Sequence, residues 1–111
     1  MRLDNLIEKI NQFRDARDWR QYHNEKDLAI SISLEEAELL EVFQWCSSEE
    51  AVQNKLPQIE EELADVFIYA IMLASNLDLD IEQLVLNKLT KNEQKYPVAK
   101  SKGRKEKYTE L

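Results

Sequence analysis

Two pairs of acidic residues are the part of this sequence best suited to chemistry: Glu35 with Glu38, and Glu62 with Asp65. Residues three apart lie on the same face of a helix, so each pair presents two carboxylates together. If the pairs faced each other across neighbouring helices, each pair of charges at 4 Å would repel by about 4 kcal/mol at an effective dielectric near 20. Such a cluster needs protonation, basic partners or a metal ion, and oxygen-only ligands suit Mg²⁺ or Mn²⁺.

The same spacing has a simpler explanation. Glutamate is a strong helix former, and acidic pairs are common on solvated helix faces. The position of both pairs at the border of apolar helix faces, rather than opposite them, makes a metal site as reasonable an interpretation as a solvated surface. On the residues alone, a metal site and a solvated surface remain open alternatives.

The elements that must position these acids are predicted to be helices. One glycine and two prolines in 111 residues leave little turn chemistry and favour an all-α chain. A polar stretch over residues 21–27 is expected to interrupt the pattern, and residues 47–50 to begin a short helical connector. The first predicted helix runs from Leu3 to Trp19, and the second from near Ser31 or Ser33 to Trp45. The third begins with a first turn marked by Pro57 and ends at Leu77. The fourth runs from Ile81 to Lys95 after a cap at Asp78 or Asp80. Pro97 ends the last helix, so we predict a domain at 1–97 and a basic, mobile tail at 98–111.

The third predicted helix carries its acids beside an apolar arc that we expect to be buried. Glu62 and Asp65 lie at one edge of this arc, with Tyr69 between them in projection. The second predicted helix is apolar nearly all round, which indicates burial by its own domain or by a partner subunit. The apolar arc of the third predicted helix consists of Ile59, Leu63, Val66, Phe67, Ala70, Ala74 and Leu77.

Charge and composition limit the class of protein. A net charge of −7 argues against a general nucleic-acid binder, which needs a basic face. Eight of the fifteen basic residues follow position 87, so the chain has a basic end that could attract a compact polyanion or could simply be a solvated tail. No apolar stretch approaches the length of a membrane span. The single cysteine, Cys46, is interpreted as structural and fits a reducing compartment, and without a signal sequence we expect a cytoplasmic protein.

The acidic motifs carry a family resemblance. Residues 35–45 (EEAELLEVFQW) and 61–66 (EELADV) resemble the paired acidic motif of the MazG-like pyrophosphohydrolases, and among them the dCTP-pyrophosphatase branch. The flanking segments at 17–23, 95–97 and 107–109 agree with it, so the resemblance covers nearly the whole chain. The broader family often has an acid where this chain has Leu34, and the dCTP-pyrophosphatase branch also lacks that acid. Ala37 replaces a common glycine, which a helix interior should accept.

This resemblance implies a four-helix, bundle-like fold that assembles as a dimer or a dimer of dimers, with the tetramer favoured. It implies hydrolysis of nucleoside triphosphates to a monophosphate and pyrophosphate, as housekeeping of the nucleotide pool. Glu35, Glu38, Glu62 and Asp65 would be both the Mg²⁺ ligands and the catalytic residues. The resemblance also implies the substrate-binding residues: Trp19 and Trp45 around the base, His23 at the base or sugar, Tyr69 at the sugar, and Lys88, Asn92, Lys95 and Tyr96 on the phosphate side.

Several alternatives stay open at this point. On the residues alone, the tryptophans could be core or interface anchors, Tyr69 an ordinary core residue, and His23 simply an exposed side chain. A metal-free helical module that binds a protein partner is a rival function, and a dUTPase-like enzyme using the same acids is another. The preferred base and sugar, with dCTP the first expectation and modified nucleotides possible, are not determined by the sequence. The same holds for the number of Mg²⁺ ions and for the general base, for which Glu41 and Glu61 are candidates.

Overall fold

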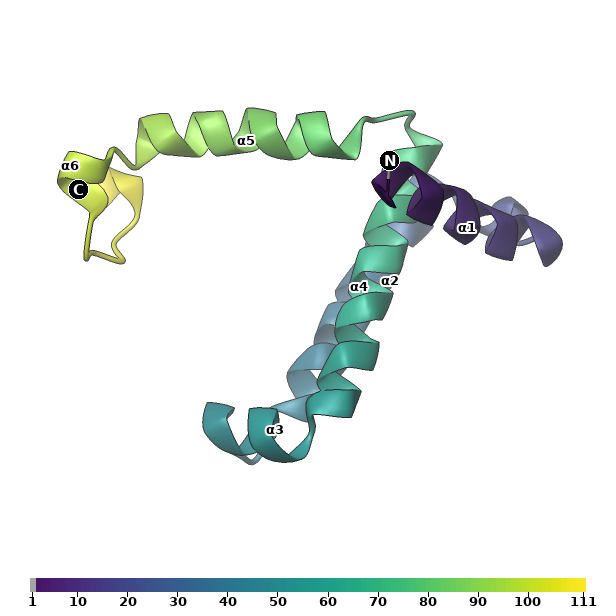
Figure 1. The fold of residues 1–111 in the computed structure, drawn as a ribbon, viewed down its shortest axis with the longest axis horizontal. Helices are drawn as coiled ribbons and strands as arrows, with labels where there is room; N and C mark the ends of the chain where they lie inside the picture. The colour runs from purple at the N-terminus through teal and green to yellow at the C-terminus, as the bar shows by residue number, and fades with distance from the viewer. Residues whose placement is uncertain (1) are drawn as a thin grey trace. The chain divides into compact units, whose positions relative to one another are not determined.

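The computed structural model describes residues 2–111, and within that range the chain is all-α, with helices and no strands. The helices are α1 Arg2–Ala16, η1 Arg20–Tyr22, α2 Glu25–Val42, α3 Ser48–Asn54, α4 Leu56–Asn76, α5 Ile81–Lys95, α6 Val98–Ser101 and η2 Tyr108–Glu110 (Figure 1). The predicted fold class is therefore confirmed. The chain divides into two compact units, one ending at Asp78 and the other spanning Leu79–Leu111.

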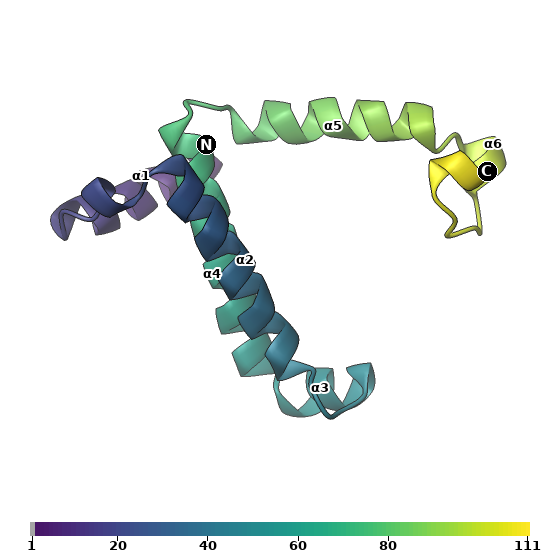
Figure 2. The same cartoon turned by 180° about the vertical axis from the view of Figure 1, so that it is seen from behind.

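An antiparallel pair of helices, α2 and α4, forms the centre of the first unit (Figures 1 and 2). The short helix α3 connects them, as the sequence predicted, and Ser47 caps it by accepting a hydrogen bond from the Glu50 amide. Pro57 lies in the first turn of α4, also as predicted. The buried apolar residues of the hairpin are Leu28, Ile71, Met72 and Ala74. Their packing holds the two acidic helices side by side.

Helix α1 ends three residues before the predicted end at Trp19, because the backbone at Asp18 is left-handed, with φ +53°. The Trp19 amide donates to the Arg14 carbonyl and the Asp18 amide to the Asp15 carbonyl, which is the hydrogen-bond pattern of a Schellman motif. Trp19 therefore lies in the loop after the helix. The last turn of α4 is joined to α1 by a hydrogen bond from the Asn11 side chain to the Ser75 hydroxyl.

Helix α2 begins six residues or more before the predicted start, so the expected break at residues 21–27 is wrong in its second half. Asn24 caps the helix: its side-chain oxygen accepts from the Asp27 amide at 2.8 Å, and its amide donates to the Asp27 carboxylate at 2.7 Å. This reciprocal cap stabilises a first turn made of polar residues. The polar residues 24–27, which suggested a loop, instead form the exposed first turn of α2 and its cap. The helix also ends earlier than predicted, at Val42.

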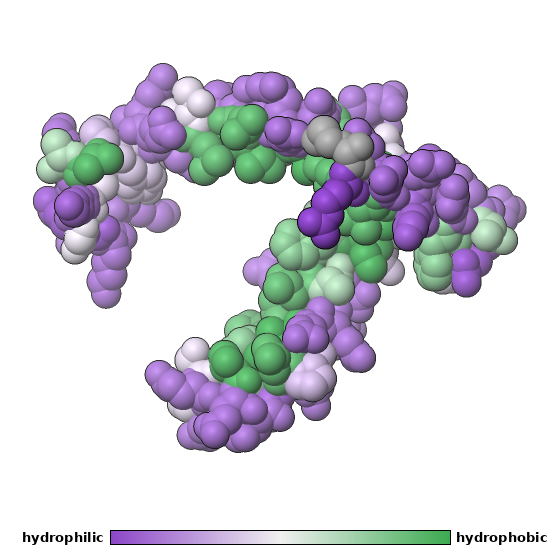
Figure 3. Space-filling view, in the orientation of Figure 1, coloured by the Kyte–Doolittle hydropathy of each residue, from purple (hydrophilic) through white to green (hydrophobic). Residues whose placement is uncertain are grey.

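The predicted buried arc of α4 is only partly buried in the chain. Of its members, Leu63, Phe67 and Leu77 are exposed and Ala74 is buried. The other buried residues of α4, Ile71 and Met72, lie outside the predicted arc. The stripe that packs along α2 includes the half-buried Glu62 and Asp65. Within the single chain, Leu28 is the one fully buried residue of α2, and Ile30, Leu34 and Leu40 are exposed, so burial of this helix by a partner subunit stays a prediction. The space-filling view shows apolar atoms gathered along this hairpin (Figure 3).

The second unit consists of α5, α6 and η2. Asp80 caps α5 by accepting from the Gln83 amide at 3.0 Å, and the helix spans Ile81–Lys95 as predicted. The residues after Pro97, predicted to be a mobile tail, contain the four-residue α6 and the turn η2. No helix within residues 2–111 combines the length and the apolar character that a membrane crossing requires.

Candidate functional site

The packing of α2 on α4 brings three of the four predicted acids together. One carboxylate oxygen from each of Glu35, Glu62 and Asp65 lies within 4.8 Å of the others, and all three side chains are half-buried. Glu35 comes from the middle of α2, and the other two come from consecutive turns of α4. This spacing lets three carboxylates face one small volume from two helices.

Glu38, one turn after Glu35, is more exposed and lies next to the cluster. Burial raises the pKa of Glu35 to about 7, with hydrogen bonding to Glu38 and the charges of Glu38, Asp65 and Glu62 adding to the effect. Burial also raises the pKa of Glu62, followed by hydrogen bonding to Glu38 and the nearby negative charges. The four acids therefore interact strongly as one group.

Two oxygens of this group make the cluster suitable for a cation. The Oε2 atoms of Glu35 and Glu62 are buried, and neither has a hydrogen-bond partner among the described residues. A buried carboxylate oxygen without a partner is costly, and a divalent cation would compensate it. The donor set is entirely carboxylate, which matches Mg²⁺ or Mn²⁺ rather than a softer metal.

Tyr69 lies close to the same acids, one turn after Asp65 on α4. Its side chain is half-buried, and burial raises the pKa of its hydroxyl, followed by the charges of Glu35, Asp65 and Glu38. The phenol is therefore neutral and can donate a hydrogen bond at the edge of the carboxylate cluster.

An aromatic group forms on the loop before α2. The rings of Trp19 and His23 lie edge to face at 6.3 Å, and the rings of Phe13 and Trp19 do so at 5.5 Å. Burial lowers the pKa of His23, and the positive charges of Arg14 and Arg20 lower it further, so the imidazole is neutral. The Asn76 side chain donates to the His23 carbonyl, which ties this loop to the end of α4.

Arg14, which sequence reasoning did not single out, is joined to this loop through its backbone carbonyl, which accepts from the Trp19 amide. Its side chain is completely buried, and its Nε donates to the Asn11 side chain at 3.1 Å. Its position continues the spacing of Leu3, Ile7 and Ile10 along α1, but a charged residue is expected to face water, so this signal of burial was not used.

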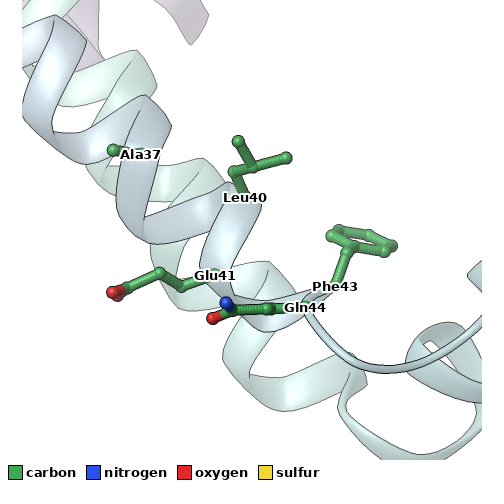
Figure 4. Close-up of a pocket in the computed structure, with 5 residues that line it drawn as sticks. All are labelled: Ala37, Leu40, Glu41, Phe43 and Gln44. Atoms are coloured by element: carbon green, nitrogen blue, oxygen red, sulfur yellow. The ribbon is translucent and has the colours of Figure 1, made fainter.

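Trp45 lies far from Trp19 within one chain. Trp19 precedes α2 and Trp45 follows it, and a helix of 18 residues is about 27 Å long. Trp45 is 92% exposed and has a left-handed backbone, with φ +67°. Beside it, a hollow of ≈ 510 Å³ at the end of α2 is lined by Ala37, Leu40, Glu41, Phe43 and Gln44 (Figure 4).

A second groove, of ≈ 520 Å³, opens at the carboxylate cluster itself. Its lining includes Glu38 and Glu62 together with Lys55, which occupies the position just before α4. Sequence reasoning did not identify Lys55, because nothing in the residue order indicates that the connector returns beside the acids. The lining residues are Glu38, Glu41, Val42, Lys55, Gln58 and Glu62.

The four predicted phosphate-side residues belong to the second unit. Lys88, Asn92 and Lys95 lie on α5, and Tyr96 is its C-cap. The Tyr96 ring packs edge to face on Tyr108 at 6.0 Å, and the Lys95 ammonium lies 4.9 Å from the centre of the Tyr108 ring. Their role toward a substrate stays a prediction.

The fold and the site define an all-α protein with a carboxylate cluster suited to a divalent cation. Residues 30–111 match the MazG-like family, and the chain belongs to that family. The predicted resemblance is thereby confirmed.

Individual relatives agree with this assignment. The chain is 39% identical to dCTP pyrophosphatase 1 of Mus musculus and 36% identical to that of Homo sapiens, each over 105 residues that make up 90% of this chain and 62% of the relative. The chain thus spans about three-fifths of the length of these curated relatives. It is also similar to the crystal structure of a pyrophosphatase from Archaeoglobus fulgidus, with a TM-score of 0.83 and 42% identity over 87% of this chain and 94% of that chain.

Proposed function

We propose that this protein hydrolyses nucleoside triphosphates to a monophosphate and pyrophosphate, with dCTP or a related or modified deoxynucleotide as substrate. The observation that carries the proposal is the carboxylate cluster of Glu35, Glu62 and Asp65, with buried oxygens that lack partners. The relatives that are named dCTP pyrophosphatases support the choice of reaction and of first substrate. The role is housekeeping of the nucleotide pool in a reducing, cytoplasmic compartment, which fits the free Cys46.

Glu35, Glu38, Glu62 and Asp65 are the residues that would hold Mg²⁺. When bound there, the ion would neutralise charge on the phosphates and orient the triphosphate for displacement at the α-phosphate. The carboxylates must be ionised to bind a cation, so Glu35 would have to be deprotonated to act as a ligand. Tyr69 remains protonated beside them and can donate to an oxygen of the sugar or phosphate.

The nucleoside end is assigned to the aromatic loop of Trp19 and His23. Stacking of a base on an aromatic ring is worth about 1–3 kcal/mol and tolerates any base. The neutral imidazole of His23 has one donor and one acceptor nitrogen, and its buried Nδ1 has no partner among the described residues. Selection among bases therefore depends on hydrogen bonds of this kind rather than on stacking.

A complete site requires a second copy of the chain. Trp19 and Trp45 lie at opposite ends of α2, so they can flank one base only if Trp45 comes from another subunit. The exposed apolar side chains of the hairpin provide the surface for such an assembly, since a contiguous apolar face is typical of subunit interfaces. These side chains include Ile30, Leu34, Leu40, Leu63 and Phe67. We take the assembly to be a dimer of dimers, with a dimer as the smaller alternative.

The test is to incubate the purified protein with each common dNTP and NTP, with and without Mg²⁺, and to resolve the products. Monophosphate and pyrophosphate formed only with the metal, and fastest from dCTP, are the expected result. Orthophosphate as product, or turnover without metal, would contradict the proposal. No turnover of any nucleotide, together with no stabilisation by nucleotide and Mg²⁺, would favour a metal-free protein-interaction module.

A further inference from the structure

The groove beside the carboxylate cluster is lined by one positively charged side chain, Lys55, which has no role in the function proposed above. Glu62 belongs both to the cluster and to the groove lining, and Glu38, which lies next to the cluster, also lines the groove, so the groove begins at the acids. Lys55 and Gln58 line its other part, from the start of α4. A ligand held at the acids would extend along this groove.

Lys55 is held in a defined position. Its side chain is half-buried, and its Nζ donates to the Val42 carbonyl at the end of α2, at 3.4 Å. The ion pairs found within residues 2–111 are Arg20–Asp15 and Arg104–Glu106, so Lys55 is paired with none of the nearby carboxylates. An ammonium has three donors, so two remain for a ligand.

The chemistry of the groove suits the end of a polyphosphate. The carboxylates alone would repel an anion, and cations bound to them would reverse that repulsion near the acids. The rest of the lining contains one further carboxylate, Glu41, and it also provides the positive charge of Lys55 and the amide donors of Gln58 for an anion. A lysine ammonium is a compact charge that can bind a phosphate oxygen without the fixed geometry of arginine.

The order of residues along α2 gives the direction. The aromatic pair Trp19 and His23 precedes the helix, Glu35 and Glu38 lie in its middle, and Lys55 contacts its last residue. A triphosphate held with its α-phosphate at the acids and its nucleoside on the side of the aromatic loop would therefore direct its β- and γ-phosphates toward Lys55.

We infer that Lys55, assisted by Gln58, binds the pyrophosphate end of the triphosphate and retains pyrophosphate until it leaves. This inference rests on the proposed pyrophosphohydrolase function. Lys55 also caps α2, because a lysine that donates to a terminal carbonyl stabilises a helix end. The experiment must therefore separate charge from capping.

Lys55→Gln separates these roles, because it keeps a hydrogen-bond donor and loses the charge. Binding of inorganic pyrophosphate and of deoxycytidine monophosphate is measured by calorimetry in the presence of Mg²⁺, along with the melting temperature of each variant. Lys55→Gln is expected to weaken pyrophosphate binding about tenfold and to leave monophosphate binding unchanged. Lys55→Arg should retain most of the affinity. Lys26→Gln, the same charge change at an exposed position in the first turn of α2, is the control and should change neither.

Unchanged pyrophosphate binding in Lys55→Gln would overturn the inference, and so would an equal loss of monophosphate binding or an equal effect of Lys26→Gln. If Lys55→Gln lowers the melting temperature, Gln58→Leu removes the neighbouring donors without touching the α2 cap. It should weaken pyrophosphate binding in the same direction, and no effect would count against the inference. Absence of triphosphate hydrolysis by the unchanged protein would instead overturn the proposed function, and pyrophosphate binding would still test Lys55.

Discussion

The two units of the chain use the same kind of helix in different ways. The α2–α4 hairpin of the first unit buries Leu28, Met72 and Ala74, and the same interface brings the carboxylates together. In the second unit, α5 has no buried residue at all, and its apolar side chains are exposed. These side chains are Leu84, Val85, Leu86 and Leu89.

This difference indicates which part of the protein is complete within one chain. Helices of about fifteen residues are marginal in water unless an apolar face is packed. The hairpin has such packing along its inner stripe, so the carboxylate cluster is a property of the single chain. Helix α5 needs a covering surface, which the assembly proposed above would provide.

The largest expected effect on activity comes from removing one carboxylate of the α2–α4 hairpin without changing how its helices pack. Asp65→Asn retains the shape of the side chain and removes one charged oxygen ligand. Turnover of the preferred triphosphate should fall about 100-fold or more, because a lost ligand weakens both cation binding and charge neutralisation at phosphorus. The rate of pyrophosphate release measures this loss.

The matched control is Glu60→Gln, the same loss of charge at an exposed position of the same helix. It should retain nearly full activity. Near-normal turnover by Asp65→Asn, with an unchanged circular dichroism spectrum, would remove Asp65 from the proposed site.

A second prediction concerns the exposed apolar faces of both units. Phe67→Lys on α4 and Leu89→Lys on α5 should each lower the molar mass of the assembly, because the Phe67 and Leu89 side chains are 59% and 50% exposed in the single chain. Burying a lysine charge in an interface is unfavourable. Light scattering after size-exclusion chromatography gives the mass of each variant.

Thr90→Lys adds the same charge next to Leu89 at an exposed polar position and should leave the mass unchanged. If the unchanged protein is a monomer, or if Thr90→Lys acts like Leu89→Lys, the need for a covering surface would be refuted.

The smallest expected effect is a pH dependence of stability confined to the hairpin. The pKa of Glu35 in the folded protein is about 7, above its ordinary value of 4.5. The stability linked to this group is therefore fully present below about pH 4.5 and is lost as the pH rises through about 7. Without metal, the melting temperature should be higher at about pH 5 than at about pH 8, and Mg²⁺ should reduce or reverse the difference.

Glu35→Gln keeps the size of the side chain without the charge, and it should flatten this dependence and abolish the effect of Mg²⁺. A metal-free protein that gains stability between those two pH values would contradict the coupling of the four acids.

Much of the local structure could be predicted from the sequence, because its causes are local. The cap at Asp80, the connector after Ser47 and Pro57 in the first turn of α4 each depend on residues a few positions apart. The acidic pairs were also identifiable, since a spacing of three in a helix places both carboxylates on one face. The start of α2 was missed because the Asn24–Asp27 cap lies within a polar stretch that reads equally well as a loop.

What the tertiary structure alone decided is which faces meet. The apolar arc containing Leu63 and Phe67 has the periodicity of a buried face, yet in the single chain the stripe with Glu62 and Asp65 packs along α2. Periodicity identifies an apolar face but does not say whether the same chain or another copy covers it. The position of Lys55 beside the acids and the distance between Trp19 and Trp45 likewise depend on how α2 and α4 pack. The sequence by itself determined the helices and the kind of chemistry, and the packing of the hairpin determined which residues share the site.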